Sequence, residues 1–143
     1  MTWCPTASAD CPAYPHTKAS YDQPMATKLQ PVRVTGVGDK LIQEFAGAAS
    51  TGHGEVSVAR MTAPPGWDEP GQRPEFDEVT YVLAGEIIVE HEGGSTSVTA
   101  GEAVLTRAGE WVRYSVGDSG ADYIAVCAPA FTITGAHRDD VSA

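Results

Sequence analysis

Hydrophobic and polar residues alternate in short runs over most of the chain, from about residue 32 to residue 131. Runs rich in Val, Ile and Thr, such as GEVSVARM at 54–61 and EIIVEH at 86–91, are typical of half-buried β-strands. Gly, Pro and Asp interrupt these runs about every ten residues, which is the spacing of turns in an antiparallel sandwich or barrel. The pattern therefore predicts an all-β domain.

Two segments depart from this alternation. The run KLIQEFAG at 40–47 fits a strand, but Leu41, Ile42 and Phe45 also have helical spacing, so a short helix over Asp39–Ala46 is the alternative. The first 30 residues are rich in proline and show no periodicity, which is typical of an extended arm. We therefore expect three parts: an extended N-terminal arm at 1–30, a β-barrel domain at 31–132 and a C-terminal tail at 133–143.

Glycines mark the expected hairpin corners. Candidate corners are the Glu-Gly-Gly run at 92–94 and the Ala-Gly pairs at 84–85, 100–101 and 108–109. Glycine tolerates the backbone conformations that tight turns require. We expect each of these sites to end one strand and begin the next.

Length and charge limit the possible functions. A chain of 143 residues is expected to form one domain around a single core. Nineteen Asp and Glu against nine Lys and Arg give a net charge of −10, which disfavours nucleic acid and anionic membrane surfaces as partners. The N-terminus lacks a basic stretch followed by an apolar one, so we expect no secretory signal and a cytoplasmic location.

The three cysteines fall into two groups. Cys4 and Cys11 each precede a proline in the expected arm. They could close a loop or hold a metal in oxidising surroundings, or remain free thiols. Cys127 stands alone in an apolar run and is expected to be a small core residue.

A regular skeleton of glycines and one acid occupies the middle of the chain. Gly66, Glu78 and Gly85 are separated by eleven and six residues, and Gly101 and Gly109 follow. This spacing resembles the two cupin motifs, G-x5-H-x-H-x3-E-x6-G and G-x5-P-x-G-x2-H-x3-N. The resemblance covers roughly residues 32–130 and implies a single-domain cupin fold, a jelly-roll β-barrel. The stretches EFDEVTYVLAGEI and VCAPAF are similar to the small ethanolamine-utilisation (EutQ-like) cupins, which implies little about the substrate.

The metal-ligand positions of these motifs are mostly replaced. In metal-binding cupins, two histidines and the glutamate of the first motif join the histidine of the second motif around one divalent ion. Here the four positions hold Gln72, Pro74, Glu78 and Val112. Pro and Val side chains coordinate nothing, and a neutral amide is a poor ligand for a transition metal. The sequence therefore predicts a barrel without the usual metal site, and we expect no cofactor.

Strand alternation places candidate side chains inside the barrel. With Glu78 inward, Thr80 and Val82 share its face, and Val112 and Tyr114 share the inner face of the second-motif strand. A carboxylate that loses water in such surroundings has a raised pKa unless a cation is close. A raised pKa makes it a general acid or base near neutral pH, and a cation makes it half of a polar anchor for a ligand.

Arg60 is the candidate cation. It points inward if Val56 and Val58, on the same side of its strand, build the core. We therefore name Glu78, Tyr114 and Arg60 as candidate catalytic residues. The candidate substrate-binding residues are Trp67, Gln72, Glu75, Thr80, Val82 and Val112.

Three functions follow from this site. The first is a metal-independent enzyme that uses acid/base chemistry on a small, largely apolar metabolite, as an isomerase, cyclase, lyase or dehydratase does. The second is a non-catalytic module that binds a small molecule. The third is a metalloenzyme with relocated ligands at Glu75, Glu78 and His53. Edge-strand pairing of the kind common among cupins predicts a homodimer.

Overall fold

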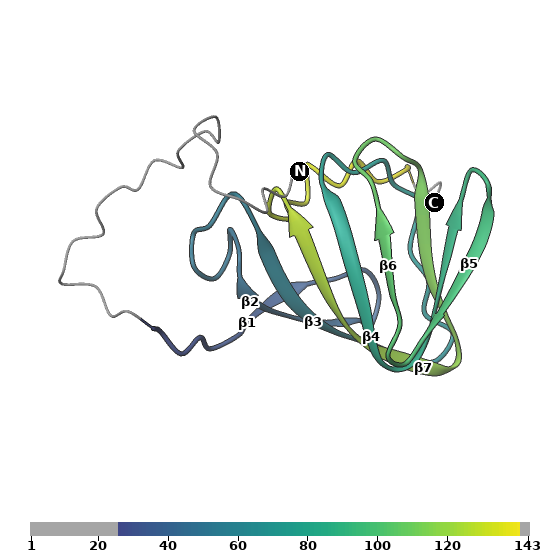
Figure 1. Ribbon diagram of the computed structural model, residues 1–143, viewed down its shortest axis with the longest axis horizontal. Coiled ribbons are helices and arrows are strands. Elements are labelled where there is room, and N and C mark those ends of the chain that lie inside the picture. The colour runs from purple at the N-terminus through teal and green to yellow at the C-terminus, as the bar shows by residue number, and fades with distance from the viewer. Residues whose placement is uncertain (1–25, 141–143) are drawn as a thin grey trace, which may run out of the picture.

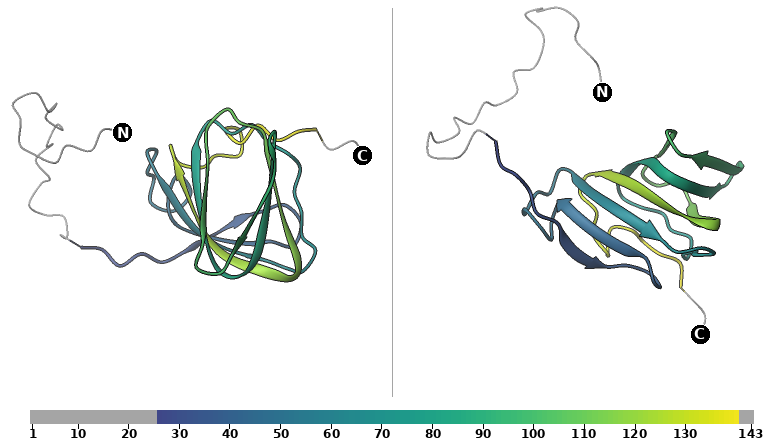
Figure 2. Two further views of the ribbon diagram at one scale, coloured as in Figure 1. Left: turned by 45° about the vertical axis from the view of Figure 1, so that its right-hand side comes forward. Right: turned by 90° about the horizontal axis from the view of Figure 1, so that it is seen from below.

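Seven antiparallel strands form one curled sheet in the computed structural model, which describes residues 26–140 (Figure 1). The strands are β1 (Val32–Thr35), β2 (Leu41–Ala46), β3 (Ser57–Ala63), β4 (Asp77–His91), β5 (Gly94–Thr99), β6 (Ala103–Thr106) and β7 (Val112–Ala128). Hydrogen bonding joins them in the order β1-β2-β3-β7-β4-β5, and β6 pairs with β4. The curled strands enclose the core, which confirms the all-β barrel (Figure 2). None of the described residues form a helix that could cross a membrane.

The two longest strands, β4 and β7, organise the barrel. They pair with each other along nearly their whole length, from Asp77 opposite Ala128 to His91 opposite Val112. The first half of β4 also pairs with β6, and its second half pairs with β5. The register of β4 against β7 shifts in two places near the middle of β4, where the strand bends. The bend lets one strand contribute to both halves of the barrel.

Gly85 lies at this bend. Its φ is +78°, and a Cβ atom at this position would lie 2.0 Å from the carbonyl oxygen of Gly120. Only glycine combines that backbone conformation with so close an approach of β4 to β7. The expected hairpin corner at 84–85 is therefore wrong, because β4 continues through it as a bulge. The other expected glycine corners do lie at turns between strands.

Of the two alternatives for residues 39–46, the strand is correct and the helix over Asp39–Ala46 is wrong. Residues 41–46 form strand β2, which pairs with β1 on one side and with β3 on the other. Ile42 and Glu44 alternate with less buried residues and point into the barrel. Local helical spacing was outweighed by backbone hydrogen bonds to two neighbouring strands, which the local sequence does not reveal.

The segment after β7 packs back onto the barrel. The ring of Phe131 meets the ring of Phe76 edge-on at 5.6 Å between centroids, and Ala136 is fully buried. The backbone N–H of Glu75 donates a hydrogen bond of 2.8 Å to the carbonyl oxygen of Gly135. We call residues 130–139 the C-terminal strap. This segment includes most of the described part of the tail that the sequence predicted at 133–143. The expected arm falls mostly outside the described residues.

Candidate functional site

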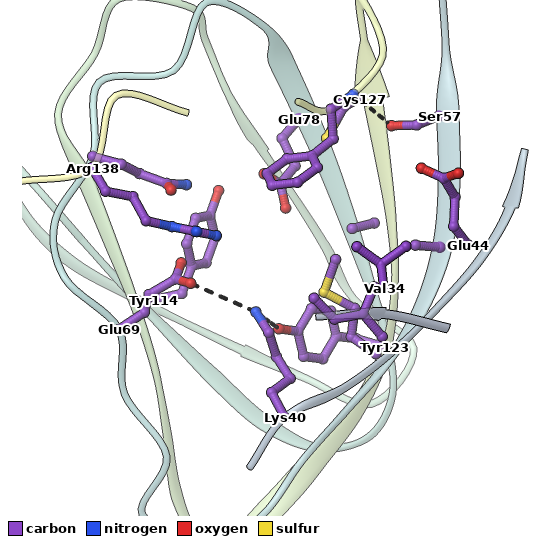
Figure 3. A pocket seen from close by; sticks show the side chains of 16 residues that line it. Val34, Lys40, Glu44, Ser57, Glu69, Glu78, Tyr114, Tyr123, Cys127 and Arg138 are labelled. Atoms are coloured by element: carbon purple, nitrogen blue, oxygen red, sulfur yellow. Dashed lines mark hydrogen bonds and ion pairs between the residues drawn. The ribbon is translucent and has the colours of Figure 1, made fainter. Parts of the chain in front are cut away.

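A cavity lies inside the barrel, between the sheet and the C-terminal strap (Figure 3). Its volume is about 40 Å³, which is room for a few water molecules. Six apolar side chains line it: Val34, Ile42, Ala59, Met61, Ala125 and Phe131. The polar lining residues are Lys40, Glu44, Ser57, Glu69, Gln72, Glu78, Tyr114, Tyr123, Cys127 and Arg138. The cavity is therefore strongly polar on part of its wall and apolar on the rest.

Glu78 is the cupin-motif acid, and its side chain reaches into the cavity as predicted. It sits on β4 between Thr106 of β6 and Cys127 of β7, and only 8% of the residue is exposed. The hydroxyl of Thr80 donates a hydrogen bond of 3.3 Å to its Oε1. Burial, and secondarily the negative charge of Glu69, raise the pKa of Glu78 to about 7, although Lys40, Thr80 and Cys127 act in the opposite direction. Near neutral pH this carboxyl can therefore either accept or donate a proton.

A buried ion pair stands close to Glu78. The Nζ atom of Lys40 lies 3.6 Å from Oε2 of Glu69, 3.5 Å from the hydroxyl of Tyr123 and 4.0 Å from the ring centroid of Trp67. Both charged residues are more than 90% buried. Burial lowers the pKa of Lys40 and raises that of Glu69, and in each case it outweighs the attraction of the partner. The pair therefore places a positive charge in the cavity at a considerable desolvation cost.

This pair was not predicted from the sequence, although a signal for half of it was present. Lys40, Ile42 and Glu44 are two residues apart, so a strand would place all three on one face. The helical alternative for 39–46 left this relation undecided. Glu69 lies on the loop after Trp67, between β3 and β4, and its inward position depends on how that loop folds over the barrel.

Two tyrosines complete the polar wall. The hydroxyl of Tyr114 on β7 shares a hydrogen bond of 2.9 Å with the hydroxyl of Thr106, and Tyr123 contacts Lys40. Burial raises the pKa of both phenols well above the usual value, and the charge of Glu78 acts in the same direction. Both therefore stay protonated at neutral pH and can donate a hydrogen bond to a ligand oxygen.

The prediction that Arg60 points into the barrel is wrong. The structure places it on the outer face of β3, where its guanidinium donates to Asp122 on β7, with Nε 3.0 Å from Oδ1. Its neighbours Ala59 and Met61 line the cavity instead. The small residues of β3 face the crowded interior of the barrel, so Arg60 lies on the outer face of the strand. Its ion pair with Asp122 on the neighbouring strand holds it there. Arg60 therefore cannot act on a ligand in this cavity.

The other predicted binding residues divide into three groups. Gln72 lines the cavity, and Thr80 reaches it through Glu78. Trp67, Val82 and Val112 are packed in the main core, where the indole N–H of Trp67 donates to the carbonyl oxygen of Val37 at 2.7 Å. They support the site rather than cap it.

Glu75 belongs to the third group, because its carboxylate is exposed and lies 2.7 Å from Nε2 of His137. His53 is also exposed and contacts Thr51. Both are thus held away from the buried carboxyl of Glu78, and no three His, Cys, Asp or Glu side chains between residues 26 and 140 are placed to share an ion. The three relocated ligands that the sequence suggested do not come together.

The donor chemistry of the four motif positions also does not fit the cupin metal. Of the four motif positions, Glu78 supplies a carboxylate and Gln72 a neutral amide, whereas Val112 is core and Pro74 has no donor. The ammonium group of Lys40 adds a positive charge to the same cavity. Divalent transition metals prefer imidazole, thiolate or several carboxylates, and a nearby cation opposes them. The described residues therefore do not form the usual site.

Comparison with known proteins identifies the class. Residues 59–127 match the family model for the cupin domain. This match and the similar solved structures show that the barrel has the cupin fold. Among solved structures, it is similar to a putative ethanolamine utilization protein Q of Salmonella typhimurium LT2, at 16% identity over 73% of this chain and all of that one, with a TM-score of 0.52.

Two further proteins are similar to this chain, one over nearly its whole length and the other over about a third of its length. PAC13 of Streptomyces, a nucleoside dehydratase also solved with uridine, has a TM-score of 0.65 at 14% identity over 82% of this chain and 93–94% of that one. A curated protein of Myxococcus xanthus strain DK1622, endoribonuclease YbeY, is 52% identical over 101 residues, which is 70% of this chain. This chain spans only 34% of that relative's length.

Proposed function

We propose that this cupin is a metal-independent enzyme that catalyses proton transfer on a small metabolite, with Glu78 as general acid and base. The observation that carries the proposal is a carboxyl of pKa about 7 that faces a cavity. An acid/base group is most effective when its pKa lies near the working pH, because both protonation states are then available. Isomerisation, cyclisation, elimination and dehydration all need this kind of group.

The residues around Glu78 suit such a reaction. The hydroxyls of Tyr114 and Tyr123 and the ammonium of Lys40 are donors on the cavity wall. Donors held in place in a poorly hydrated site stabilise negative charge that develops on a substrate oxygen. Proton transfer at Glu78 and charge stabilisation by these donors would together lower the barrier for removal of a proton next to a carbonyl or hydroxyl group.

The lining also narrows the substrate class. The sequence suggested a largely apolar metabolite, and most of the cavity surface is apolar, but ten of the sixteen lining residues also bring a polar or charged group to it. We therefore favour a small compound that carries oxygen functions on a short carbon skeleton. The nucleoside dehydratase among the similar structures shows that this fold accommodates an elimination, although at 14% identity the likeness extends to the fold alone.

Ribonuclease activity is not part of this proposal. The Myxococcus relative is named an endoribonuclease, but this chain matches only a third of its length. A net charge of −10 opposes the approach of a polyanion, and the cavity is too small for a nucleotide chain. The small enclosed site favours a metabolite.

Exchange in heavy water tests the proposal whichever of these proton-transfer reactions the protein catalyses. The full chain is incubated in D₂O with pools of hydroxy and oxo metabolites, and ¹H NMR follows the loss or change of carbon-bound proton signals. We expect at least one compound to exchange or react, and Glu78→Gln to slow that reaction by about 10²-fold or more, because Gln cannot carry the proton.

Glu110→Gln is the matched control, because Glu110 is an exposed carboxylate outside the cavity. It should react at the wild-type rate. If compounds bind but none exchanges or reacts, or if Glu78→Gln reacts as fast as the wild type, the enzyme proposal fails. Binding without reaction would instead support the non-catalytic alternative.

A further inference from the structure

Two polar groups on the cavity wall have no hydrogen-bond partner among the described residues. They are Nε of Arg138, on the C-terminal strap, and Oε1 of Gln72, on the loop before β4. Both atoms are buried, and Gln72 as a whole is 4% exposed. Buried donors and acceptors without partners are uncommon in folded proteins, because each loses its water without replacement. Two together, one a donor and one an acceptor, indicate a place that a ligand completes.

The backbone holds the two groups side by side. Gln72 and Arg138 form an antiparallel bridge, so their side chains start from neighbouring positions. On its other side Gln72 exchanges two backbone hydrogen bonds of 2.9 Å with Val112. The guanidinium carbon of Arg138 lies 5.8 Å from the ring centroid of Phe131. These contacts fix the pair in position before any ligand arrives, which reduces the entropy cost of binding.

The guanidinium of Arg138 attracts the carboxylate of Glu69 but forms no ion pair with it. Between residues 26 and 140, no acid lies within ion-pair distance of the guanidinium of Arg138. Lys40, the other cation of the cavity, already pairs with Glu69. Arg138 thus offers its donors to an anion, whereas the nearby amide of Gln72 can accept from a hydroxyl group.

We propose that Arg138 and Gln72 form the anchor for the carboxylate and adjacent hydroxyl of a small hydroxy acid. The carboxylate accepts from the guanidinium, and the hydroxyl donates to Oε1 of Gln72. Arg138 and Glu78 reach into the cavity from different sides, so a hydroxy acid anchored at Arg138 presents its carbon chain toward Glu78 (Figure 3). This inference rests on the proposed function and gives its substrate class.

A phosphate group fits less well. The same cavity holds Glu69 and Glu78, which repel a dianion more than a monoanion. A planar carboxylate also matches the flat edge of a guanidinium in two parallel hydrogen bonds. With a cavity volume of about 40 Å³, a short chain fits more readily than a phosphorylated one.

Calorimetric titration of the full chain tests the anchor. The probes are glycolate, D- and L-lactate and 3-hydroxybutyrate, each compared with its neutral amide, and inorganic phosphate. We expect at least one hydroxy acid to bind about 10-fold or more tightly than its amide and than phosphate. Arg138→Gln should weaken that binding about 10-fold or more, since it removes a charge-assisted hydrogen bond.

Four further variants separate the anchor from folding and from catalysis. Arg138→Lys keeps the positive charge but lacks the planar pair of N–H donors, so it should bind the hydroxy acid with intermediate affinity. Gln72→Met should bind it less tightly than the wild type does. Arg73→Gln, at an exposed arginine that pairs with Glu92, is the control and should bind normally. Glu78→Gln should lose turnover but keep binding, so the two proposals fail separately.

Equal binding of acid and amide overturns the inference, as does wild-type affinity in Arg138→Gln. So does the absence of binding by every hydroxy acid in the panel. Tighter binding of phosphate than of any carboxylate also overturns it, because the anchor would then serve a phosphorylated ligand.

Discussion

Glu78→Gln is expected to stabilise the folded protein by about 3 kcal/mol at pH 9 and to leave its stability almost unchanged at pH 4. The reason is the rise in the pKa of this carboxyl from 4.5 in the unfolded chain to about 7 in the barrel. At 1.36 kcal/mol for each pH unit, that rise corresponds to about 3 kcal/mol. Below pH 4.5 the carboxyl is protonated in both states, so its burial then costs little.

The sign follows from the proton count. Between pH 4.5 and 7 the folded protein holds a proton on Glu78 that the unfolded chain has released, so the wild type loses stability as the pH rises through this window. Glutamine has the same shape, carries no titratable proton and avoids this loss. Urea unfolding of both proteins from pH 4 to pH 9 measures the difference, with Glu110→Gln as an exposed control. Parallel curves for Glu78→Gln and wild type would contradict the expectation.

Lys40→Met is expected to destabilise the protein by about 3–5 kcal/mol at pH 8. The change removes the ammonium 3.6 Å from Glu69 and leaves that carboxylate buried without its counter-ion. The loss should shrink toward pH 4, because Glu69 then takes up a proton and no longer needs the cation. Urea unfolding at the two pH values measures both effects.

The double variant Lys40→Met/Glu69→Leu tests whether the ion pair as a whole stabilises the folded protein or destabilises it. Burial shifts the pKa of both partners toward their neutral forms, so the pair does not recover its desolvation cost. We therefore expect the double variant to recover most of the stability that Lys40→Met loses. If the double variant is as unstable as the single one, the lysine stabilises the fold through its contacts with Trp67 and Tyr123 rather than through Glu69.

Both predictions describe a site that works against the stability of its own barrel. Three ionisable residues, Lys40, Glu69 and Glu78, are buried together at a cost that apolar residues would avoid. Natural proteins tolerate such costs where function needs the groups. The simultaneous presence of unpaired polar atoms at Gln72 and Arg138 fits the same interpretation.

The barrel could be predicted because its strands carry a clear alternation. On β4, the inward side chains Glu78, Thr80 and Val82 alternate with the exposed Val79 and Tyr81, as the period of two requires. The cupin spacing fixed which of the two faces was internal. Where both faces of a strand carry apolar residues, as on β3, the alternation is ambiguous, and this is how Arg60 was assigned to the wrong side.

The rest of the site depends on contacts between distant parts of the chain. Arg138 enters the cavity because the C-terminal strap pairs with the loop that holds Gln72, sixty-six residues earlier in the sequence. Lys40 meets Glu69 across two different loops. No local pattern marks such pairs, since their closeness follows from the closure of the barrel and not from the spacing of neighbouring residues.

The most direct test of the central claim is the titration of the Glu78 carboxyl by ¹³C NMR, with its signal assigned by its absence in Glu78→Gln. The structure predicts a midpoint near pH 7, because the group is buried in a cavity beside a second acid. A midpoint at or below 4.5 would show a carboxylate that is hydrated or firmly paired with a cation, and would contradict the proposed acid/base role.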